Sequence, residues 1–253
     1  MFKIVSLLDE SLVLDLAGAR TINGIPIQLW NDNGTLAQRW RFSAAETVRQ
    51  RANRLASENV DVLQDGTYSI ATLLSGKKVI DVPGASYTSG SNLWLYSDNG
   101  TDAQVWTVSH DSSGYITIKN TVSGKALDVR NGNASQSSVV QLWDSNGTWA
   151  QKWIAISTSN GFKLLSALNS ILALDVKSAS IANGAPLQLW TDNGTLAQYW
   201  SVTATSTARM RLDKLATDNK DAIEDGTYAF RSDLLLSLVL DARDGSTQNG
   251  TAI

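Results

Sequence analysis

Apolar and polar positions alternate over short segments in the middle of the chain, and glycine, asparagine and serine separate these segments. Alternation with a period of two predicts half-buried β-strands joined by turns. The clearest set lies at residues 125–129, 139–143 and 151–156. The same pattern recurs between residues 65 and 203, which predicts an all-β fold for this part of the chain.

Two segments, 44–63 and 205–223, interrupt the β pattern. Both are rich in alanine, arginine, acidic residues and leucine, and both lack glycine and proline. Their apolar residues recur at helical spacing, which predicts one helix in each. These residues are Val48, Ala52 and Leu55 in the first segment, and Ala208, Leu212 and Leu215 in the second. We expect both segments to be helical linkers.

A longer pattern repeats along the whole chain. A complete copy has an aspartate, then a Gln-x-Trp motif at a constant distance, then a turn and a second Gln-x-Trp motif. The best-kept copies start at Asp128 and Asp175, and other copies depart from this pattern. The intervals between successive aspartates run long, short, short and long, so three copies make one larger period, and residues 1–93 align with 161–253 without a gap. Such regularity indicates a repeat protein. The aspartates are Asp15, Asp81, Asp128, Asp175 and Asp241.

A linker follows every third copy, and this spacing divides the chain. We predict that residues 65–203 form one complete domain of three copies, between helical linkers at 43–64 and 204–224. Residues 1–42 are then the last third of a preceding domain, and residues 225–253 are the start of a following one. On this interpretation the chain is a piece of a longer array.

The second Gln-x-Trp of each copy follows an Asn-Gly pair, as in Asp192-Asn193-Gly194-Thr195. Asparagine and glycine accept positive φ, so these segments are predicted to be hairpin tips. Each is also an N-glycosylation sequon, but the recurrence at one place in the repeat favours the turn. The other segments are 32–35, 98–101 and 145–148.

Three copies of similar length, each ending in Gln-x-Trp, resemble the ricin-B-type lectin family. The closing motifs of the three copies at 65–203 are Gln104-Val105-Trp106, Gln151-Lys152-Trp153 and Gln198-Tyr199-Trp200, and the copy with Asp15 closes with Gln38-Arg39-Trp40. The resemblance covers all of the chain except the two linkers. It implies a β-trefoil, here with flanking partial trefoil units joined by helical linkers, as in tandem bacterial forms.

In that family a sugar occupies a shallow pocket on each copy, where an aspartate accepts hydrogen bonds from hydroxyl groups and an aromatic ring stacks on the sugar. A pyranose has one face of C–H bonds and a rim of hydroxyls, so this pairing is chemically sound. The resemblance implies as acceptors Asp15, Asp81, Asp128 and Asp175; as platforms Trp30, Tyr96, Trp143 and Trp190; and as further site residues Gln28, Gln38, Gln104, Gln141, Gln151, Gln188, Gln198, Asn33, Asn99, Asn146 and Asn193.

Each of these residues also has a structural interpretation. The aspartates could cap loops through backbone N–H groups, and the aromatic residues could belong to the core. For the closing tryptophans, Trp40, Trp106, Trp153 and Trp200, we favour the core.

Two departures from the family pattern weaken the sites. The family's sugar-contacting asparagine is replaced by alanine just before each closing glutamine, and the hairpin asparagines could substitute for it. In the copy with Asp81, Trp94 stands in the glutamine place and Tyr96 in the tryptophan place. We therefore rank the Asp128 and Asp175 copies first, then the Asp81 copy, then the Asp15 copy. The alanines are Ala37, Ala103, Ala150 and Ala197.

Composition limits the alternatives. The net charge is −3 and no run of lysine or arginine marks a polyanion site, so we expect no nucleic-acid partner. Cysteine is absent, which excludes disulfide bonds and cysteine-based zinc sites. No apolar stretch reaches membrane-spanning length, so membrane insertion is not expected. Asp-Asn-Gly turns alone do not make a calcium loop. We expect no metal and no cofactor.

His110 is the only histidine, and Ser109-His110-Asp111 is a run along the chain rather than a triad in space. The sequence thus predicts a non-catalytic, multivalent carbohydrate-binding protein, a monomeric array that attaches to a repetitive cell-wall or host-surface glycan, with galactose-type sugars implied by the resemblance. The alternative is a structural spacer or protein-binding adhesin segment with degenerate sites. We expect a secreted or bacterial surface protein whose export signal lies outside this chain.

Overall fold

The computed structural model describes residues 1–43, 45–75, 77–220, 222–223, 226, 231–232 and 235–239. Most of the copy predicted at 225–253, including Asp241, lies outside the described residues. Two short paired strands are described there, β15 (Arg231–Ser232) and β16 (Leu235–Val239).

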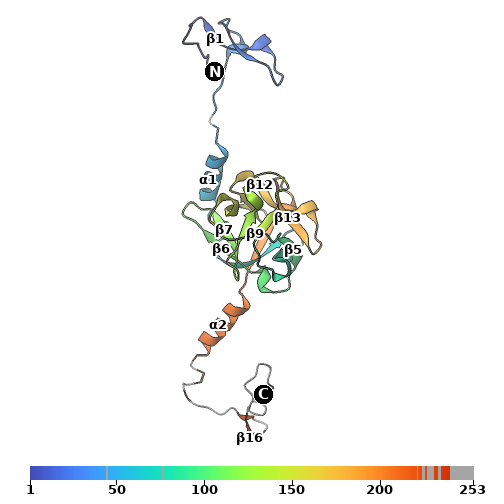
Figure 1. The fold of residues 1–253 in the computed structure, drawn as a ribbon. Helices are drawn as coiled ribbons and strands as arrows, with labels where there is room; N and C mark the ends of the chain where they lie inside the picture. Colours follow the sequence, from blue (N-terminus) through green and yellow to red (C-terminus); the bar gives the residue numbers. More distant parts are fainter. Residues whose placement is uncertain are drawn as a thin grey trace.

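Strands β3 to β14 lie between the two helices and form one antiparallel network (Figure 1). They are β3 (Gly66–Thr72), β4 (Lys78–Asp81), β5 (Trp94–Ser97), β6 (Trp106–His110), β7 (Ile116–Asn120), β8 (Ala126–Val129), β9 (Val140–Trp143), β10 (Trp153–Thr158), β11 (Gly161–Ser166), β12 (Asn169–Val176), β13 (Ala185–Thr191) and β14 (Trp200–Ala204).

Six of these strands, two from each copy, close a barrel. β3 pairs with β6, β6 with β7, β7 with β10, β10 with β11, β11 with β14, and β14 with β3. The other six form three hairpins, β4–β5, β8–β9 and β12–β13, which touch one another through strand pairing and isolated bridges. This architecture is a β-trefoil, so the predicted fold class is confirmed.

The closing tryptophans of the trefoil are core residues, as predicted. Trp106, Trp153 and Trp200 are fully buried at the start of barrel strands. Each indole Nε1 donates to the carbonyl oxygen of the residue before a repeated aspartate, over 3.0 to 3.3 Å. Each tryptophan therefore ties the barrel to the hairpin that carries an aspartate.

The prediction that the Asn-Gly segments are hairpin tips is wrong. Gly147 has a positive φ of 69°, but the strand that follows, β10, pairs with β7 and β11 and not with β9. Asn146 Oδ1 instead accepts the backbone N–H of Thr148 over 3.1 Å, a turn that leads into a single-turn 3-10 helix. The strand predicted at 151–156 consequently begins at Trp153. The equivalent 3-10 helices are η2 (Leu36–Gln38), η4 (Asp102–Gln104), η6 (Trp149–Gln151) and η8 (Leu196–Gln198).

Helix α1 (Val48–Glu58) packs on the trefoil through small residues. Ala52 and Ala56 are fully buried in a cluster with residues of β10, β11 and β12. Gly114 allows the close approach, because a Cβ atom there would lie 2.5 Å from the carbonyl oxygen of Ala56. Asn53 Oδ1 also accepts the hydroxyl of Tyr115 over 2.7 Å.

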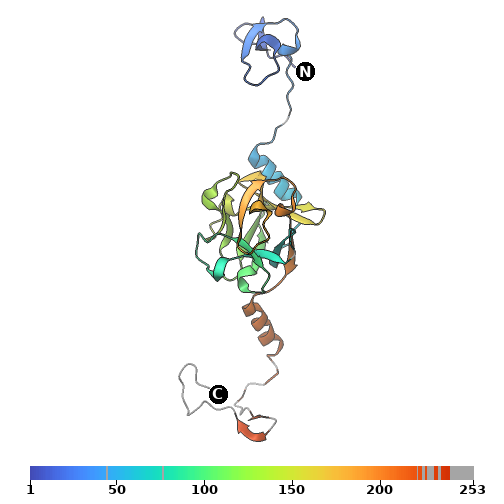
Figure 2. The same ribbon diagram turned by 90° about the vertical axis from the view of Figure 1, so that its right-hand side faces the viewer.

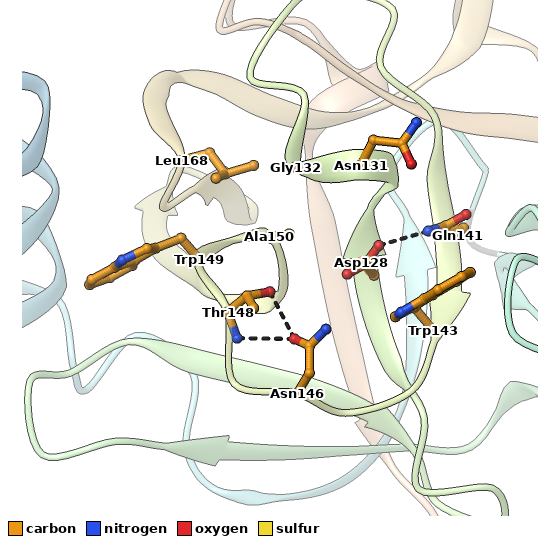
Figure 3. Close-up of a pocket in the computed structure, with 10 residues that line it drawn as sticks. All are labelled: Asp128, Asn131, Gly132, Gln141, Trp143, Asn146, Thr148, Trp149, Ala150 and Leu168. Atoms are coloured by element: carbon orange, nitrogen blue, oxygen red, sulfur yellow. Dashed lines mark hydrogen bonds between the residues drawn. The ribbon is translucent and has the colours of Figure 1, made fainter.

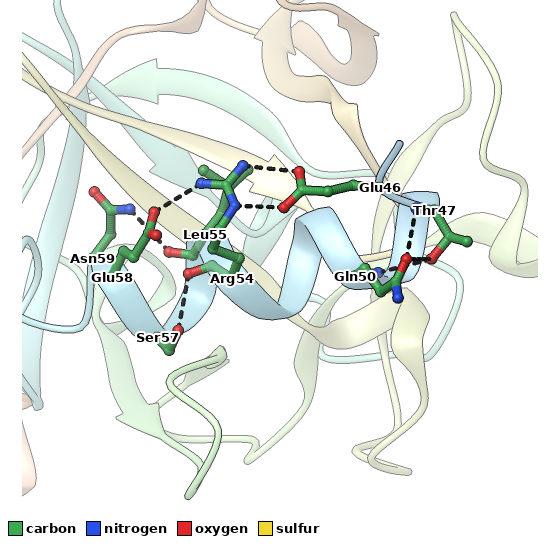
Figure 4. A network of polar contacts seen from close by, with 8 residues as sticks. All are labelled: Glu46, Thr47, Gln50, Arg54, Leu55, Ser57, Glu58 and Asn59. Atoms are coloured by element: carbon green, nitrogen blue, oxygen red, sulfur yellow. Dashed lines mark hydrogen bonds and ion pairs between the residues drawn. The ribbon is translucent and has the colours of Figure 1, made fainter. Parts of the chain in front are cut away.

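The outer face of α1 is polar (Figure 4). The side chains of Thr47 and Gln50 form a reciprocal capping box at its start. Arg54 forms ion pairs with Glu46 and Glu58. One face of the helix thus meets the trefoil while the other meets solvent.

Helix α2 (Ala208–Asp218) contains no buried residue. Its first N–H, on Ala208, donates to Asp102 Oδ1 over 2.9 Å, and both ribbon views show the rest of the helix leading away from the trefoil on the side opposite to α1 (Figures 1 and 2). Within the described ranges, no helix is long and apolar enough to cross a membrane.

Before α1 the chain forms one further copy of the repeat. Strands β1 (Leu12–Leu16) and β2 (Ile27–Asn31) make a hairpin, and a 3-10 helix, η1 (Ala17–Ala19), lies between them. The ribbon places this copy apart from the trefoil (Figure 2).

Candidate functional site

The repeated aspartates lie where the trefoil hairpins pair. Asp128 on β8 is the register partner of Gln141 on β9, and Gln141 Nε2 donates to Asp128 Oδ1 over 2.9 Å. Gln151 Nε2, from η6, donates to Asp128 Oδ2 over 3.1 Å. Each carboxylate oxygen therefore accepts one amide hydrogen bond and can accept a second hydrogen bond from a ligand.

Asp128 opens into a cavity of about 430 Å³, although its own surface is only 4% exposed. Figure 3 shows Trp143 on one side of the carboxylate and Asn146 below it. Trp143 is 39% exposed, so its ring offers an accessible aromatic plane next to an oriented acceptor. This is the pairing that the sequence predicts for this copy.

The same arrangement recurs at Asp175. Gln188 Nε2 donates to Asp175 Oδ1 over 2.9 Å, and Gln198 Nε2 donates to Oδ2 over 3.2 Å. A cavity of about 500 Å³ brings together Asp175, Trp190 and Asn193. Two neighbouring copies thus hold similar sites.

The Asp81 copy keeps the carboxylate but changes one donor. Gln104 Nε2 donates to Asp81 Oδ2 over 3.0 Å, while the indole Nε1 of Trp94 donates to Oδ1 over 2.6 Å in place of a glutamine amide. Trp94 and Tyr96 lie nearly parallel, with ring centroids 6.1 Å apart, and both line a cavity of about 430 Å³. The Asp81 copy therefore differs from the others in one of the two groups that hold its carboxylate.

In the copy at Asp15, Gln28 Nε2 donates to Asp15 Oδ1 over 2.9 Å. Gln38 Nε2 donates to the carbonyl oxygen of Asn31. Trp30 is 54% exposed.

The closing glutamines position the other site residues rather than face a ligand. Gln151 is fully buried, and besides Asp128 its amide bonds the carbonyl oxygen of Asp144 and the backbone N–H of Asn146. The sequence grouped these glutamines with the sugar-contacting residues, but the structure places them behind the carboxylates. The equivalent residues Gln38, Gln104 and Gln198 make the same bond to the backbone N–H of an asparagine.

The turn asparagines present their amide groups to the cavities. Asn146 Oδ1 accepts both the backbone N–H and the hydroxyl of Thr148, which fixes the amide so that its Nδ2 points toward Asp128 (Figure 3). Asn99 and Asn193 make the same two bonds and also line their cavities. Each trefoil cavity thus holds a donor beside the acceptor. Asn33 makes these bonds in the Asp15 copy.

Burial raises the pKa of Asp81, Asp128 and Asp175 above the ordinary value. The hydrogen bonds from glutamine, or from Trp94 and Gln104 at Asp81, act in the opposite direction because they stabilise the charged form. The sites therefore hold carboxylates that are costly to ionise and are oriented by neutral donors.

Sequence reasoning missed the residues just after the aspartates. Asn131 and Gly132 line the Asp128 cavity, and Lys177 and Ser178 line the Asp175 cavity. They lie in single-turn 3-10 helices with positive φ at Asn131 and Ser178. Their constant distance from the aspartates is the sequence feature that could have identified them as site residues. These helices are η3 (Pro83–Ala85), η5 (Arg130–Gly132) and η7 (Lys177–Ala179).

Trp149 was also missed. It borders the Asp128 cavity, but in Figure 3 its ring points away from the carboxylate. Arg49 of α1 lies 3.4 Å from the centroid of that ring, and Tyr115 meets it edge-on at 5.3 Å. The other copies have Leu36, Asp102 and Leu196 at this place. Trp149 therefore serves as the anchor for the helix.

His110 and its neighbours do not form a catalytic arrangement among the described residues. His110 Nδ1 lies 2.6 Å from Asp65 Oδ1, and Asp111 pairs with Lys152. In the described part of the chain, no group of three histidine, cysteine, aspartate or glutamate side chains is placed to hold a metal ion.

Three pockets on one β-trefoil, each with an oriented aspartate beside an aromatic ring, define a lectin-like class of protein. The model of the ricin-type beta-trefoil lectin domain-like family matches residues 59–143, 102–190 and 149–253. The chain belongs to this family.

Two of the solved structures that match share about a third of their aligned residues with part of this chain. The designed three-fold symmetric protein ThreeFoil shares 33% identity with a TM-score of 0.53, covering 56% of this chain and 100% of its own. An exo-beta-1,3-galactanase from Clostridium thermocellum shares 30% identity with a TM-score of 0.53, and the match covers 57% of this chain but only 31% of the galactanase.

A mosquitocidal holotoxin matches 98% of this chain over 26% of its own length, at 21% identity and a TM-score of 0.50, which shows the fold alone. Among curated proteins the comparison finds no match.

Proposed function

We propose that this chain is a non-catalytic carbohydrate-binding protein that attaches to a repetitive glycan through the pockets at Asp81, Asp128 and Asp175. The observation that carries the proposal is the threefold recurrence of a carboxylate held by two neutral donors beside an accessible aromatic ring. Family membership supports carbohydrate binding in general.

Each pocket has the chemistry that a pyranose requires. The free acceptor capacity of the aspartate suits two adjacent hydroxyl groups, and the Nδ2 of the turn asparagine supplies a donor to a ring or hydroxyl oxygen. The aromatic plane stacks on the C–H face of the sugar. Galactose-type sugars are the first class to test.

Single pockets this open are expected to bind weakly, with a Kd on the order of a millimolar. Three pockets on one domain meet a polymer together, so the effective concentration of the second and third contact raises the apparent affinity. The proposed ligand is thus a repeating polymer, such as a cell-wall or host-surface polysaccharide. The proposal places the protein outside the cell, where such polymers occur.

The test is a heteronuclear NMR titration of the full chain with methyl β-galactoside, lactose and soluble cell-wall fragments, following the tryptophan indole signals. We expect the indoles of Trp143 and Trp190 to shift. Asp128→Ala abolishes the response of Trp143 while that of Trp190 persists. Asp144→Ala is the matched control, because this nearby aspartate is exposed and pairs with Lys125.

The alternative is a structural spacer or protein-binding segment whose pockets bind no sugar. Alanine before each closing glutamine favours it, since Ala103, Ala150 and Ala197 line the cavities without a polar group. A folded protein whose indole signals stay unchanged with every sugar would support the spacer and reject the lectin. A hydrolytic activity lost in His110→Ala would contradict the non-catalytic part of the proposal.

A further inference from the structure

Trp94 gives the Asp81 pocket a wall that the other two pockets lack. Gln141 and Gln188 hold this position in the other copies, and both are buried. Trp94 keeps their hydrogen bond to the carboxylate but remains partly exposed and lines the cavity. An indole therefore occupies the place of a carboxamide beside the acceptor.

The ring of Trp94 also faces the glycine that corresponds to the one facing the aromatic platform of the Asp128 pocket. In the Asp128 pocket, a Cβ atom on Gly90 of the preceding copy would lie 3.6 Å from Cζ3 of the platform residue Trp143. In the Asp81 pocket, the equivalent glycine, Gly184, faces Trp94, with Cε3 at 3.5 Å from its Cβ position. Tyr96 then stacks on Trp94 and extends the aromatic surface.

The exchange also removes polar groups. The Oε1 atom of Gln141 accepts the Nε group of Arg130 over 2.8 Å, so the Asp128 copy has an amide acceptor and a cation at this edge. Lys177 stands at the equivalent of Arg130 in the Asp175 copy, and Pro83 does so in the Asp81 copy. Val82, Ala85 and Ala103 add apolar lining to the Asp81 cavity, and Asn99 and Thr101 add polar lining.

We propose that the Asp81 pocket selects sugar residues that carry a methyl group, either on an acetamido substituent or on a 6-deoxy carbon, and that Trp94 determines this selectivity. The proposal rests on the proposed carbohydrate-binding function. Asp81 supplies the anchor for hydroxyl groups as in the other pockets, and the paired rings of Trp94 and Tyr96 cover the methyl group. Hydroxyl-rich or acidic sugars gain nothing from the indole of Trp94, because it offers neither an acceptor nor a cation and its N–H already bonds Asp81.

The experiment titrates the full chain with methyl β-galactoside, N-acetylgalactosamine and 6-deoxygalactose, and follows the indole signals of Trp94, Trp143 and Trp190 separately. We expect the Trp94 signal to respond to at least one methyl-bearing sugar with a Kd about fourfold lower than to methyl β-galactoside, the ratio expected for burial of one methyl group. The two methyl-bearing sugars distinguish an acetamido preference from a 6-deoxy preference. Trp143 and Trp190 are expected to show no such preference.

Two variants test the role of the indole. Trp94→Gln restores the residue that the other pockets use, so the Asp81 pocket, now followed through Tyr96, is expected to lose its preference. Gln188→Trp introduces the indole into the Asp175 pocket, where the preference is expected to appear. This second variant tests the idea even if Trp94→Gln does not fold.

The outcomes separate the two proposals. If no indole responds to any sugar, the proposed function fails. If Trp143 and Trp190 respond but the Asp81 pocket is empty or binds all sugars equally, only the selectivity of Trp94 is rejected.

Discussion

Residues 1–58 and 161–218 are related by the larger period of the chain, yet their burial is opposite. In the first region strand β2 of the hairpin is mostly exposed and the helix is packed; in the second the hairpin is mostly buried and the helix is exposed. Phe2 is 58% exposed and its counterpart Phe162 is 4% exposed. Ala56 of α1 is fully buried, whereas its counterpart Ala216 of α2 is exposed.

The local structure of the two regions is nevertheless the same. Phe2 pairs with Trp40 as Phe162 pairs with Trp200. Thr47 and Thr207 each cap a helix through a 3.1 Å bond from the third backbone N–H. The comparison indicates that local sequence determines these hairpins and helices, while contact with the trefoil strands β3 to β14 determines which of them are buried.

The comparison predicts the largest difference at the closing tryptophans. Trp200→Ala removes a fully buried indole from the barrel, so the free energy of unfolding should fall by about 3–5 kcal/mol. Trp40→Ala, its counterpart in the exposed copy, should change the main transition by less than about 0.5 kcal/mol. Denaturant unfolding followed by far-ultraviolet circular dichroism measures both. Equal losses would mean that the first copy shares the core of the trefoil.

The two helices provide the second matched pair. Ala56→Asp places a charged side chain against the trefoil, where the backbone of α1 lies close to Gly114. It should lower the free energy of unfolding by about 2–4 kcal/mol. Ala216→Asp places the same side chain on an exposed surface and should cost less than about 0.5 kcal/mol. Denaturant unfolding followed by far-ultraviolet circular dichroism measures both changes. A comparable cost for Ala216→Asp would show that α2 packs on a surface in solution.

Much of this fold could be predicted because its signals are local and repeated. The Asp and Gln-x-Trp spacing and the gapless period indicate the trefoil, and helical spacing indicates α1 and α2. The prediction for the Asn-Gly turns is wrong because the identity of a turn residue indicates its own φ angle but not which strands pair on either side of the turn. The packing of α1 depends on Gly114 and Trp149, which lie far from the helix in sequence. Trp149 follows no repeat, and Gly161, the counterpart of Gly114 in the next copy, lies against the backbone of Trp200 instead of a helix.

The candidate sites were predicted in composition but not in arrangement. The aspartates, aromatic residues and asparagines line the cavities of the trefoil. The separate roles of these residues could not be predicted from the sequence, because a glutamine that orients a carboxylate and one that contacts a ligand have the same place in the motif. The use of Trp94 as a hydrogen-bond donor to Asp81 required the three-dimensional register of β4 and β5.

The third prediction concerns Gln198 and its counterpart Gln38. Gln198→Ala leaves the N–H of Asn193 and the carbonyl of Thr191 without their side-chain partner, so the free energy of unfolding should fall by about 1–3 kcal/mol. The pKa of Asp175 should rise further, since the bond from Gln198 lowers it. Carboxyl NMR titration measures this shift.

Two controls accompany that variant. Gln151→Ala should raise the pKa of Asp128 and leave that of Asp175 unchanged, because Gln151 bonds only the former carboxylate. Gln38→Ala should leave the main unfolding transition of the trefoil unchanged. An unaltered pKa of Asp175 in Gln198→Ala would show that its carboxylate is held by other groups.

The smallest effect expected is the pH dependence that the buried carboxylates impose. Burial raises the pKa of Asp175 in the folded protein above the ordinary 3.8, so between these two values the folded chain binds a proton that the unfolded chain does not. This contribution to stability is fully present below pH 3.8 and is lost as the pH rises through the folded pKa. The stability of the natural chain relative to Asp175→Asn should therefore increase as the pH falls through that window, which denaturant unfolding at a series of pH values measures.

A control variant in the Asp15 copy and a measurement of sugar binding test this last prediction further. Asp15→Asn, in the exposed copy, should follow the natural chain in the main transition at every pH. Sugar binding at Trp190 should weaken as the pH falls through the same window, because protonation of Asp175 removes its negative charge and turns one acceptor oxygen into a donor. Binding that persists below pH 3.8 would contradict a role for the ionised carboxylate.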